Sequence, residues 1–335
     1  MAWVDTVRGP VDAAELGAVL MHEHLFLLSS PAGLRHPESI PDEERRVGEA
    51  VDRLGRLKER GIDALVDLTV VGAGRYLPRI QEVAARVDLH IIVAAGVFVL
   101  DRLPPELGAH PDPGRALVET FIGEVREGIG GTGVRAAVLK CATGRRGLTP
   151  DVELVLRATA RAQLATGVPI CTHTHARSRN GLDQLRVFAG EGVDPARVVI
   201  GHSGDTTDLD YLREMMEKGA CIGMDRFGID PLLGFERRVD TVARLCRMGY
   251  AAKMVLSHDA SCYNDAFPEE RAAEVPNWHY GHLSDDVIPA LLSRGVDRAQ
   301  IRAMLVGNPR AIFAGGSGRR ERHDPNLLCS QEEER

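Results

Sequence analysis

The strongest constraint on the fold is a regular alternation of short apolar segments with amphipathic ones. The amphipathic stretches 41–61, 151–167 and 207–219 carry acidic residues near their starts and end with Gly, and the stretch 237–250 carries Arg and Gly near its end, as helices favour. Apolar strands separated by helices are typical of a parallel sheet covered on its faces, and eight such units close into a barrel. We therefore predict an α/β fold, a single-domain (β/α)8 TIM barrel, with strands at 17–24, 63–70, 90–98, 135–142, 168–175, 197–204, 221–228 and 253–260.

The barrel is predicted to occupy residues 1–315. The polar, low-complexity segment 316–335 is typical of a mobile tail. A chain of 335 residues suits one large barrel, and no linker divides it.

Charge and composition restrict the partners. The net charge is −7 and the basic residues are scattered, which argues against nucleic acid and anionic membranes. No leader pattern opens the chain, and no apolar run approaches the roughly 18 residues of a membrane span. The six cysteines are widely separated and include no CxxC pair. These features predict a cytoplasmic protein that acts on a small molecule.

Polar residues gather where the predicted strands end. Barrel active sites are built at the carboxyl ends of the strands. Six of the twelve histidines lie there, and convergence of these side chains predicts a metal site. The residues at these ends are His22, His24, Lys140, His173, His175, His202, His258 and Asp259.

Lys140 is unusual because its neighbours in "AAVLKCA" are apolar, and an unpaired buried ammonium is costly. It can form an ion pair with a carboxylate, act as a Schiff-base lysine, or be carbamylated by carbon dioxide into an anionic metal ligand. The surrounding histidines favour the carbamate, since imidazoles supply no charge to balance two divalent cations. Imidazole with carboxylate suits zinc, manganese, cobalt or iron. Zinc is our first expectation.

Together these motifs resemble the phosphotriesterase family of the amidohydrolase superfamily, and especially its lactonase branch. The resemblance runs from about residue 5 to about residue 314, through "MHEH", "VLKCAT", "THTHARSRNGLDQ", "VVIGHSGDTTDLDYL", "GMDRFGID" and "VLSHDA".

The resemblance implies a binuclear metal centre. His22, His24 and Asp259 would hold the more buried cation, and His173 and His202 the more exposed one. Lys140, as N6-carboxylysine, and a hydroxide would bridge the two. Asp259 would accept the proton.

Other residues match the family's pattern in part. Arg226 and Asp205 occupy the positions of its proton relay, although a simple ion pair is an equal alternative. His175 and His258 match no ligand, which leaves them a supporting role.

Substrate selection is expected in the loops after the seventh and eighth strands. Tyr263, Phe267 and Trp278 are candidate substrate contacts, or they pack a long loop onto the barrel. Phe98 stands where the lactonase branch usually has a tyrosine, so a hydroxyl that would orient a lactone is missing.

The predicted function is hydrolysis of lactones, acyl-homoserine lactones among them, with promiscuous organophosphate triester hydrolysis. The resemblance suggests a homodimer. A dedicated phosphotriesterase (aryldialkylphosphatase) or another carboxylic ester hydrolase is the runner-up. A Schiff-base aldolase using Lys140 and a metal-binding scaffold without turnover are the remaining alternatives.

Overall fold

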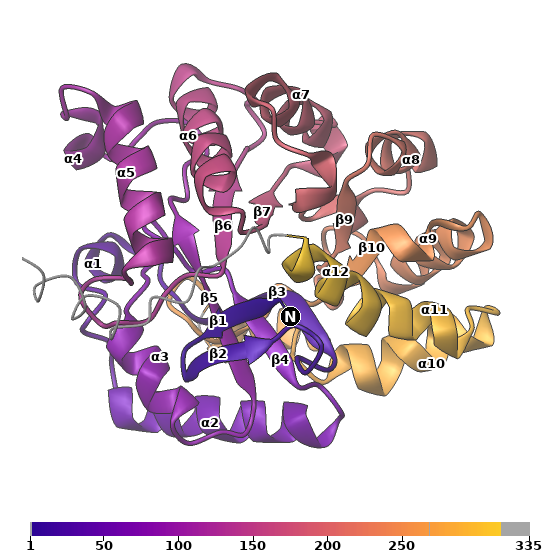
Figure 1. Cartoon of the computed structure of the whole chain (residues 1–335). Helices are drawn as coiled ribbons and strands as arrows, with labels where there is room; N and C mark the ends of the chain where they lie inside the picture. Colours follow the sequence, from indigo (N-terminus) through magenta and orange to yellow (C-terminus); the bar gives the residue numbers. More distant parts are fainter. Residues whose placement is uncertain (1, 268, 316–335) are drawn as a thin grey trace, which may run out of the picture.

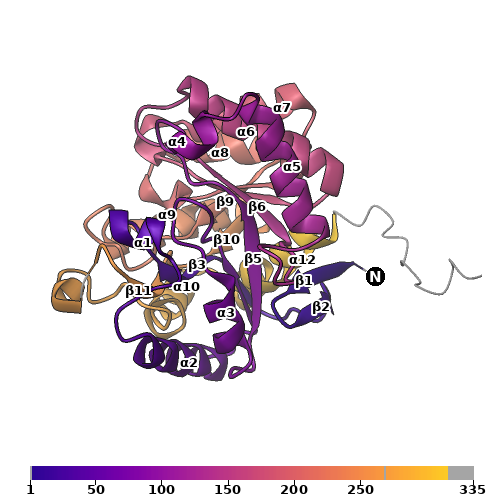
Figure 2. The ribbon, with the colours of Figure 1, turned by 90° about the vertical axis from the view of Figure 1, so that its left-hand side faces the viewer.

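The computed structural model of the chain describes residues 2–267 and 269–315. Its centre is a parallel sheet that curls into a barrel, with helices around the outside (Figures 1 and 2). The strand order is β10-β9-β8-β7-β6-β5-β4-β3-β11, and every neighbouring pair is parallel. The predicted (β/α)8 TIM barrel is confirmed. The predicted tail, 316–335, lies outside the described residues.

All eight predicted barrel strands are present, but most end before the predicted carboxyl end. The residues that follow them leave the hydrogen-bonded ladder of the sheet. Two of them, His202 and Asp259, adopt a positive φ that a strand excludes. The strands are β3 (Val19–Leu27), β4 (Ala64–Asp67), β5 (His90–Gly96), β6 (Val138–Ala142), β7 (Ile170–His173), β8 (Val198–Ile200), β9 (Cys221–Met224) and β10 (Met254–Leu256).

The barrel closes between β3 and the chain that follows β10. The Asp259 N–H donates to the carbonyl of His22 at 3.1 Å, and the His24 N–H donates to the carbonyl of Ala260 at 2.9 Å. A ninth strand, β11 (Ser261–Asn264), then continues parallel to the far end of β3. Strand β11 was not predicted from the sequence, because its pairing partner lies more than 200 positions earlier in the chain.

The helices cover the outer face of the sheet. One lies between each pair of successive strands, and shorter ones occupy the loops and the C-terminal part. They are α1 (Pro31–Arg35), α2 (Glu43–Glu59), α3 (Leu77–Ala84), α4 (Pro105–Gly108), α5 (Pro113–Arg126), α6 (Pro150–Thr166), α7 (Gly181–Glu191), α8 (Leu209–Glu217), α9 (Phe235–Arg247), α10 (Ile288–Ser293), α11 (Arg298–Arg302) and α12 (Asn308–Ala314).

A two-stranded hairpin, β1 (Trp3–Thr6) and β2 (Gly9–Asp12), precedes the barrel. It was not predicted. The hairpin is anchored at the amino-terminal end of the barrel, where the Val7 N–H donates to the carbonyl of Ile91 near the start of β5 at 2.8 Å. Among the described residues, no helix combines the length and apolar character needed to cross a membrane.

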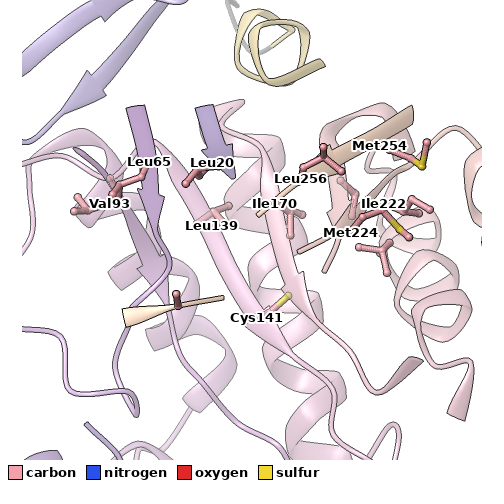
Figure 3. Close-up of a cluster of buried hydrophobic side chains, with 14 of the residues drawn as sticks. Leu20, Leu65, Val93, Leu139, Cys141, Ile170, Ile222, Met224, Met254 and Leu256 are labelled. Carbon is pink, nitrogen blue, oxygen red and sulfur yellow. The ribbon is translucent and has the colours of Figure 1, made fainter. Parts of the chain in front are cut away.

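Alternation along the strands separates two apolar cores. One set of strand residues, including Leu20, Leu139 and Ile170, packs against the helices (Figure 3). The other set, including Val138 and Cys171, fills the barrel interior. A strand side chain two positions beyond an interior residue also faces inward, and it lies closer to the carboxyl end of the barrel than these apolar residues.

Candidate metal centre

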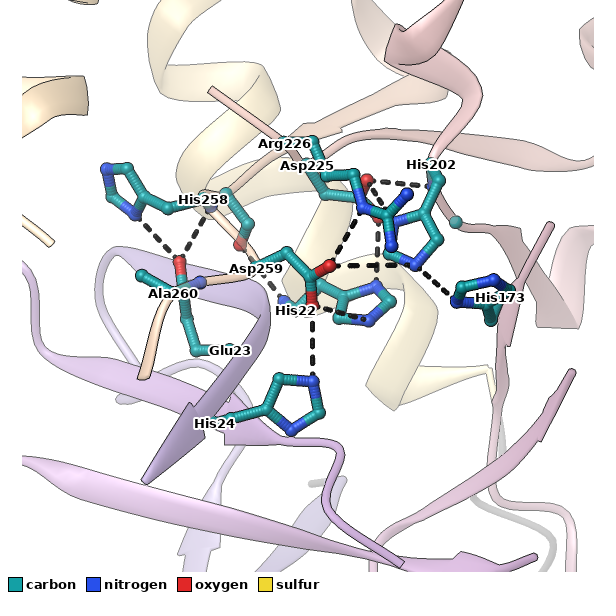
Figure 4. A network of polar contacts seen from close by, with 12 residues as sticks. His22, Glu23, His24, His173, His202, Asp225, Arg226, His258, Asp259 and Ala260 are labelled. Atoms are coloured by element: carbon teal, nitrogen blue, oxygen red, sulfur yellow. Dashed lines mark hydrogen bonds and ion pairs between the residues drawn. The ribbon is translucent and has the colours of Figure 1, made fainter. Parts of the chain in front are cut away.

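His22 and His24 reach the interior because of an irregularity in β3. The register between β3 and β4 shifts by one residue between Leu20 and Glu23. An extra residue in one strand is a β-bulge, and it re-aims the side chains that follow. Both imidazoles then face Asp259: His24 Nε2 lies 3.2 Å from Asp259 Oδ1, and His22 Nε2 lies 3.5 Å from the same oxygen (Figure 4).

Lys140 and His173 follow the alternation rule directly. Each lies two positions beyond an interior apolar residue, Val138 and Cys171 respectively. Lys140 Nζ approaches His22 Nε2 to 2.9 Å, and the side chain is buried. Burial lowers the pKa of Lys140 to about 8, although the charge of Asp259 acts in the opposite direction. The amine is therefore more readily neutral than that of a surface lysine.

His202 begins the turn after β8 in the left-handed region, at φ 58°. This conformation turns its ring towards His173, and His202 Nε2 lies 2.9 Å from His173 Nδ1. The preceding residue must be glycine for a steric reason, because a Cβ at Gly201 would lie 2.0 Å from the carbonyl oxygen of Thr172. The chain must lack a side chain at 201 to bring His202 this close.

Asp259 also has a left-handed backbone, at φ 55°. Its Oδ2 accepts a hydrogen bond from Arg226 Nε at 2.8 Å. Burial raises the pKa of the Asp259 carboxyl, but His202, Arg226 and His22 together outweigh burial and hold it well below the usual value. The carboxylate therefore stays ionised among the imidazoles.

Asp225 is a site residue that the sequence analysis missed. It lies 2.9 Å from His22 Nδ1 and 3.1 Å from His202 Nδ1, and it accepts the His202 backbone N–H at 2.8 Å. It thereby fixes two rings so that their Nε2 atoms face the centre, an arrangement typical of metal-binding histidines. A signal for Asp225 was present in the sequence: like Asp259, it is an acidic residue at the end of a barrel strand, and it directly precedes Arg226.

These donors fit a divalent cation. Ligand atoms of His22, His24 and Asp259 lie within 4.8 Å of one another. Burial lowers the pKa of His22, His173 and His202 well below the usual value, and nearby cationic groups add to this. Neutral imidazoles with an ionised carboxylate are the donors that zinc and related metals prefer. Joint binding of a cation would be a physical reason for these polar residues to be buried together.

A chain of charges leads away from Asp259. Arg226 Nη1 donates to Asp205 Oδ2 at 3.0 Å, and Arg238 Nη2 donates to Asp205 Oδ1 at 2.8 Å. Burial lowers the pKa of Arg226, but Asp259 and Asp205 reverse this effect and raise it overall. The structure therefore joins Asp259, Arg226 and Asp205 into one network, with Arg238 as an additional member.

The predicted substrate contacts lie in different surroundings. The Phe98 ring meets the His173 imidazole edge-on, with 5.2 Å between centroids. Phe267 packs edge-on against Trp278 at 5.4 Å. Tyr263 lies in β11 with the guanidinium of Arg46, from α2, 4.8 Å above its ring. All four roles in substrate binding stay predictions.

The two remaining histidines have protein partners. His175 Nδ1 lies 2.7 Å from the hydroxyl of Ser178. His258 Nδ1 lies 2.8 Å from Glu23 Oε1, and both side chains are fully buried. These contacts agree with supporting roles outside the ligand set.

The model of the phosphotriesterase family matches residues 2–313 of this sequence. The chain belongs to the phosphotriesterase family. A phosphotriesterase homology protein from Mycobacterium tuberculosis is 52% identical over 324 residues, covering 95% of this chain and 99% of the relative. An aryldialkylphosphatase from Saccharolobus solfataricus is 34% identical over 311 residues, covering 92% and 98%.

A solved structure of the same kind is described as "Molecular Engineering of Organophosphate Hydrolysis Activity from a Weak Promiscuous Lactonase Template". It is 36% identical, has a TM-score of 0.86, and covers 93% of this chain and 100% of that one. The resemblance seen in the motifs is confirmed, and the chain is a hydrolase of the phosphotriesterase family.

Proposed function

We propose that this phosphotriesterase-family protein is a metal-dependent hydrolase of lactones, acyl-homoserine lactones among the candidates, with weaker hydrolysis of organophosphate triesters. The observation that carries the proposal is the meeting of His22, His24, Lys140, His173, His202 and Asp259 at one end of the barrel.

Two divalent cations, zinc by preference, would be held by the imidazoles, by Asp259 and by Lys140 as N6-carboxylysine. Carbamylation joins the nitrogen of the neutral Lys140 amine to the carbon of carbon dioxide with loss of one proton. An ammonium group must first lose a proton of its own, so two protons leave in all when the buried cation becomes an anion. Cations in such a site polarise an ester carbonyl or phosphoryl oxygen and lower the pKa of water.

Asp259 is the proton acceptor in this proposal. Its carboxylate is ionised and lies within the group of imidazoles, so it can take the proton released as water attacks the ester. Arg226 orients this carboxylate. A guanidinium stays protonated in proteins, so Arg226 holds Asp259 and Asp205 in place without carrying the proton itself.

Apolar side chains around the site support a substrate with an acyl chain. Phe98 lies against His173, and large exposed apolar residues occur in the segments that follow the carboxyl ends of four strands. These residues are Leu34, Val71, Leu100 and Leu232. The lactonase template named for the structural relative supports the same substrate class.

A dedicated phosphotriesterase is the second candidate, favoured by the aryldialkylphosphatase relative. The deciding experiment compares kcat/KM of metal-loaded protein on a long-chain acyl-homoserine lactone and on paraoxon, with chelator-treated protein as the control. We expect the lactone to be preferred. A clear preference for paraoxon would reverse the ranking, and two bound metals without turnover on any ester would indicate a scaffold. We also propose a cytoplasmic homodimer, to be checked by localisation and by light scattering.

A further inference from the structure

The backbone around Asp259 is hydrogen-bonded at every polar group. The N–H groups of His258 and Ala260 donate to the Glu23 carboxylate, and that of Asp259 donates to the His22 carbonyl. The carbonyls of His258 and Asp259 both accept the indole N–H of Trp278, at 3.2 and 3.0 Å. The carbonyl of Ala260 accepts the His24 N–H.

Glu23 is the centre of this arrangement. It lies between His22 and His24 in β3, and its fully buried side chain contacts His258 and Ala260 (Figure 4). Its Oε1 accepts the His258 N–H at 2.8 Å and its Oε2 accepts the Ala260 N–H at 2.9 Å, so the two oxygens bind the residues on either side of Asp259.

The His258 ring adds a third bond to Glu23. Its Nε2 accepts the backbone N–H of Leu283 at 3.0 Å, which leaves Nδ1 as the protonated nitrogen. The Nδ1–H then donates to Glu23 Oε1 at 2.8 Å. Glu23 thus connects β3 through His258 to the segment that begins the last helices.

These bonds explain the unusual conformation of Asp259. Residues other than glycine seldom adopt φ 55°; aspartate tolerates this region better than most, and its surroundings decide whether it is populated. Bonds on both sides of Asp259 enforce it here, and the resulting conformation directs the carboxylate towards His24, His22 and Arg226. One strand therefore supplies two imidazoles and also fixes the carboxylate that meets them.

We propose that Glu23, together with His258 and Trp278, positions Asp259 for ester hydrolysis. This inference rests on the proposed function, in which Asp259 is a metal ligand and proton acceptor. Glu23 is a positioning residue, because it reaches the reacting atoms only through Asp259. Trp278 acts on the same backbone through its indole N–H.

Glu23→Gln tests the proposal with little change in size. The amide places an NH2 group against a backbone N–H, so at least one of the bonds flanking Asp259 is lost. We expect kcat to fall about 10- to 100-fold with KM changed less than about threefold, and Zn²⁺ to be released about tenfold more readily to a competing chelator. Glu124→Gln is the matched control. Glu124 lies in α5, outside the barrel interior, and its carboxylate binds Arg75. We expect kcat and metal retention of this variant to stay at the wild-type level.

Trp278→Phe provides a second test if Glu23→Gln does not fold. It keeps an aromatic ring but removes the indole N–H, and we expect kcat to fall about tenfold with retained secondary structure. Values of kcat and chelator sensitivity within about twofold of wild type in the folded variants would overturn the proposal.

Two readouts separate this inference from the proposed function. If the wild-type protein hydrolyses no lactone or triester, the proposed function fails, while chelator competition still measures the effect of Glu23 on the site. A crystal structure of Glu23→Gln gives φ of Asp259 independently of metal and substrate. We expect residue 259 to leave the left-handed region, and an unchanged φ with unchanged metal retention would contradict the inference.

Discussion

The Phe98 ring and the imidazole of His173 stand perpendicular to each other, with 5.2 Å between centroids and 88° between ring planes. Phe98 is held by its own backbone, whose N–H donates to the Val71 carbonyl at 2.8 Å. An aromatic side chain is therefore fixed beside an imidazole of the candidate metal centre, at the position where a tyrosine would add a hydroxyl.

Phe98→Tyr is expected to improve lactone hydrolysis. The new hydroxyl can donate to a lactone oxygen, and one hydrogen bond of about 1 kcal/mol corresponds to about a fivefold gain in kcat/KM. Steady-state kinetics on a lactone and on paraoxon measure the change, with Phe98→Leu as the control that removes the ring. A Phe98→Tyr variant with an unchanged or reduced lactone rate would show that the hydroxyl has no role here.

Lys140→Met is expected to abolish turnover while keeping the fold. In the metal-free proteins, replacing Lys140 removes the cost of burying its amine, so the midpoint of thermal unfolding of the metal-free variant should equal or exceed that of the metal-free wild type. Without the anionic ligand, bound metal per chain should fall and kcat should drop more than about 100-fold. Elemental analysis and activity assays test both effects.

The modification of Lys140 is tested separately. Native mass spectrometry of the wild-type protein should show one carbon dioxide adduct that is absent from Lys140→Met. Trapping of substrate on Lys140 by borohydride, without any metal requirement, would favour the Schiff-base alternative instead.

The placement of the candidate ligands Lys140 and His173 could be predicted from sequence because it follows a local rule. Strand alternation places Lys140 above Val138 and His173 above Cys171, and the carboxyl ends of barrel strands meet at one edge. Alternation alone would place His22 on the same side as Leu20, against the helices, and the bulge in β3 is what turns this part of the strand inward.

The residues that support the ligands could not be predicted in the same way. Asp225 acts through the outward-facing nitrogens of two rings, and Glu23 acts on a segment 235 positions later in the chain. Their partners are set by closure of the barrel, which leaves no periodic pattern in the sequence. The hairpin β1–β2 was missed because its two strands have only four residues each and gain their support from β5.

Asp259→Asn is expected to lower kcat about 10²- to 10⁴-fold, the usual contribution of a general acid–base group. Asparagine accepts the left-handed conformation, and its amide oxygen can still accept the Arg226 Nε–H, so the fold should persist. Activity and circular dichroism are measured together, with the exposed Asp240→Asn as the control. Near-normal turnover in Asp259→Asn would exclude the proposed proton acceptor.

Arg238 is fully buried in α9, and its guanidinium makes four hydrogen bonds at the other end of the charge network. It donates to Asp205 Oδ1 at 2.8 Å and to the carbonyls of Gly204, Leu233 and Ile229. The last two carbonyls belong to the loop after β9, so Arg238 fastens this loop to the carboxylate that binds Arg226.

Arg238→Met is therefore expected to reduce both stability and activity. Breaking a buried ion pair on one side costs about 3–5 kcal/mol, and we expect the lower end because Asp205 keeps Arg226 as a partner. Urea unfolding measures the loss. Arg237→Met is the matched control, since that neighbouring side chain is exposed and makes one weak contact with Thr207, and it should change the free energy of unfolding by less than about 0.5 kcal/mol. Equal stability of the two variants would mean that the buried guanidinium does not support the loop or Asp205.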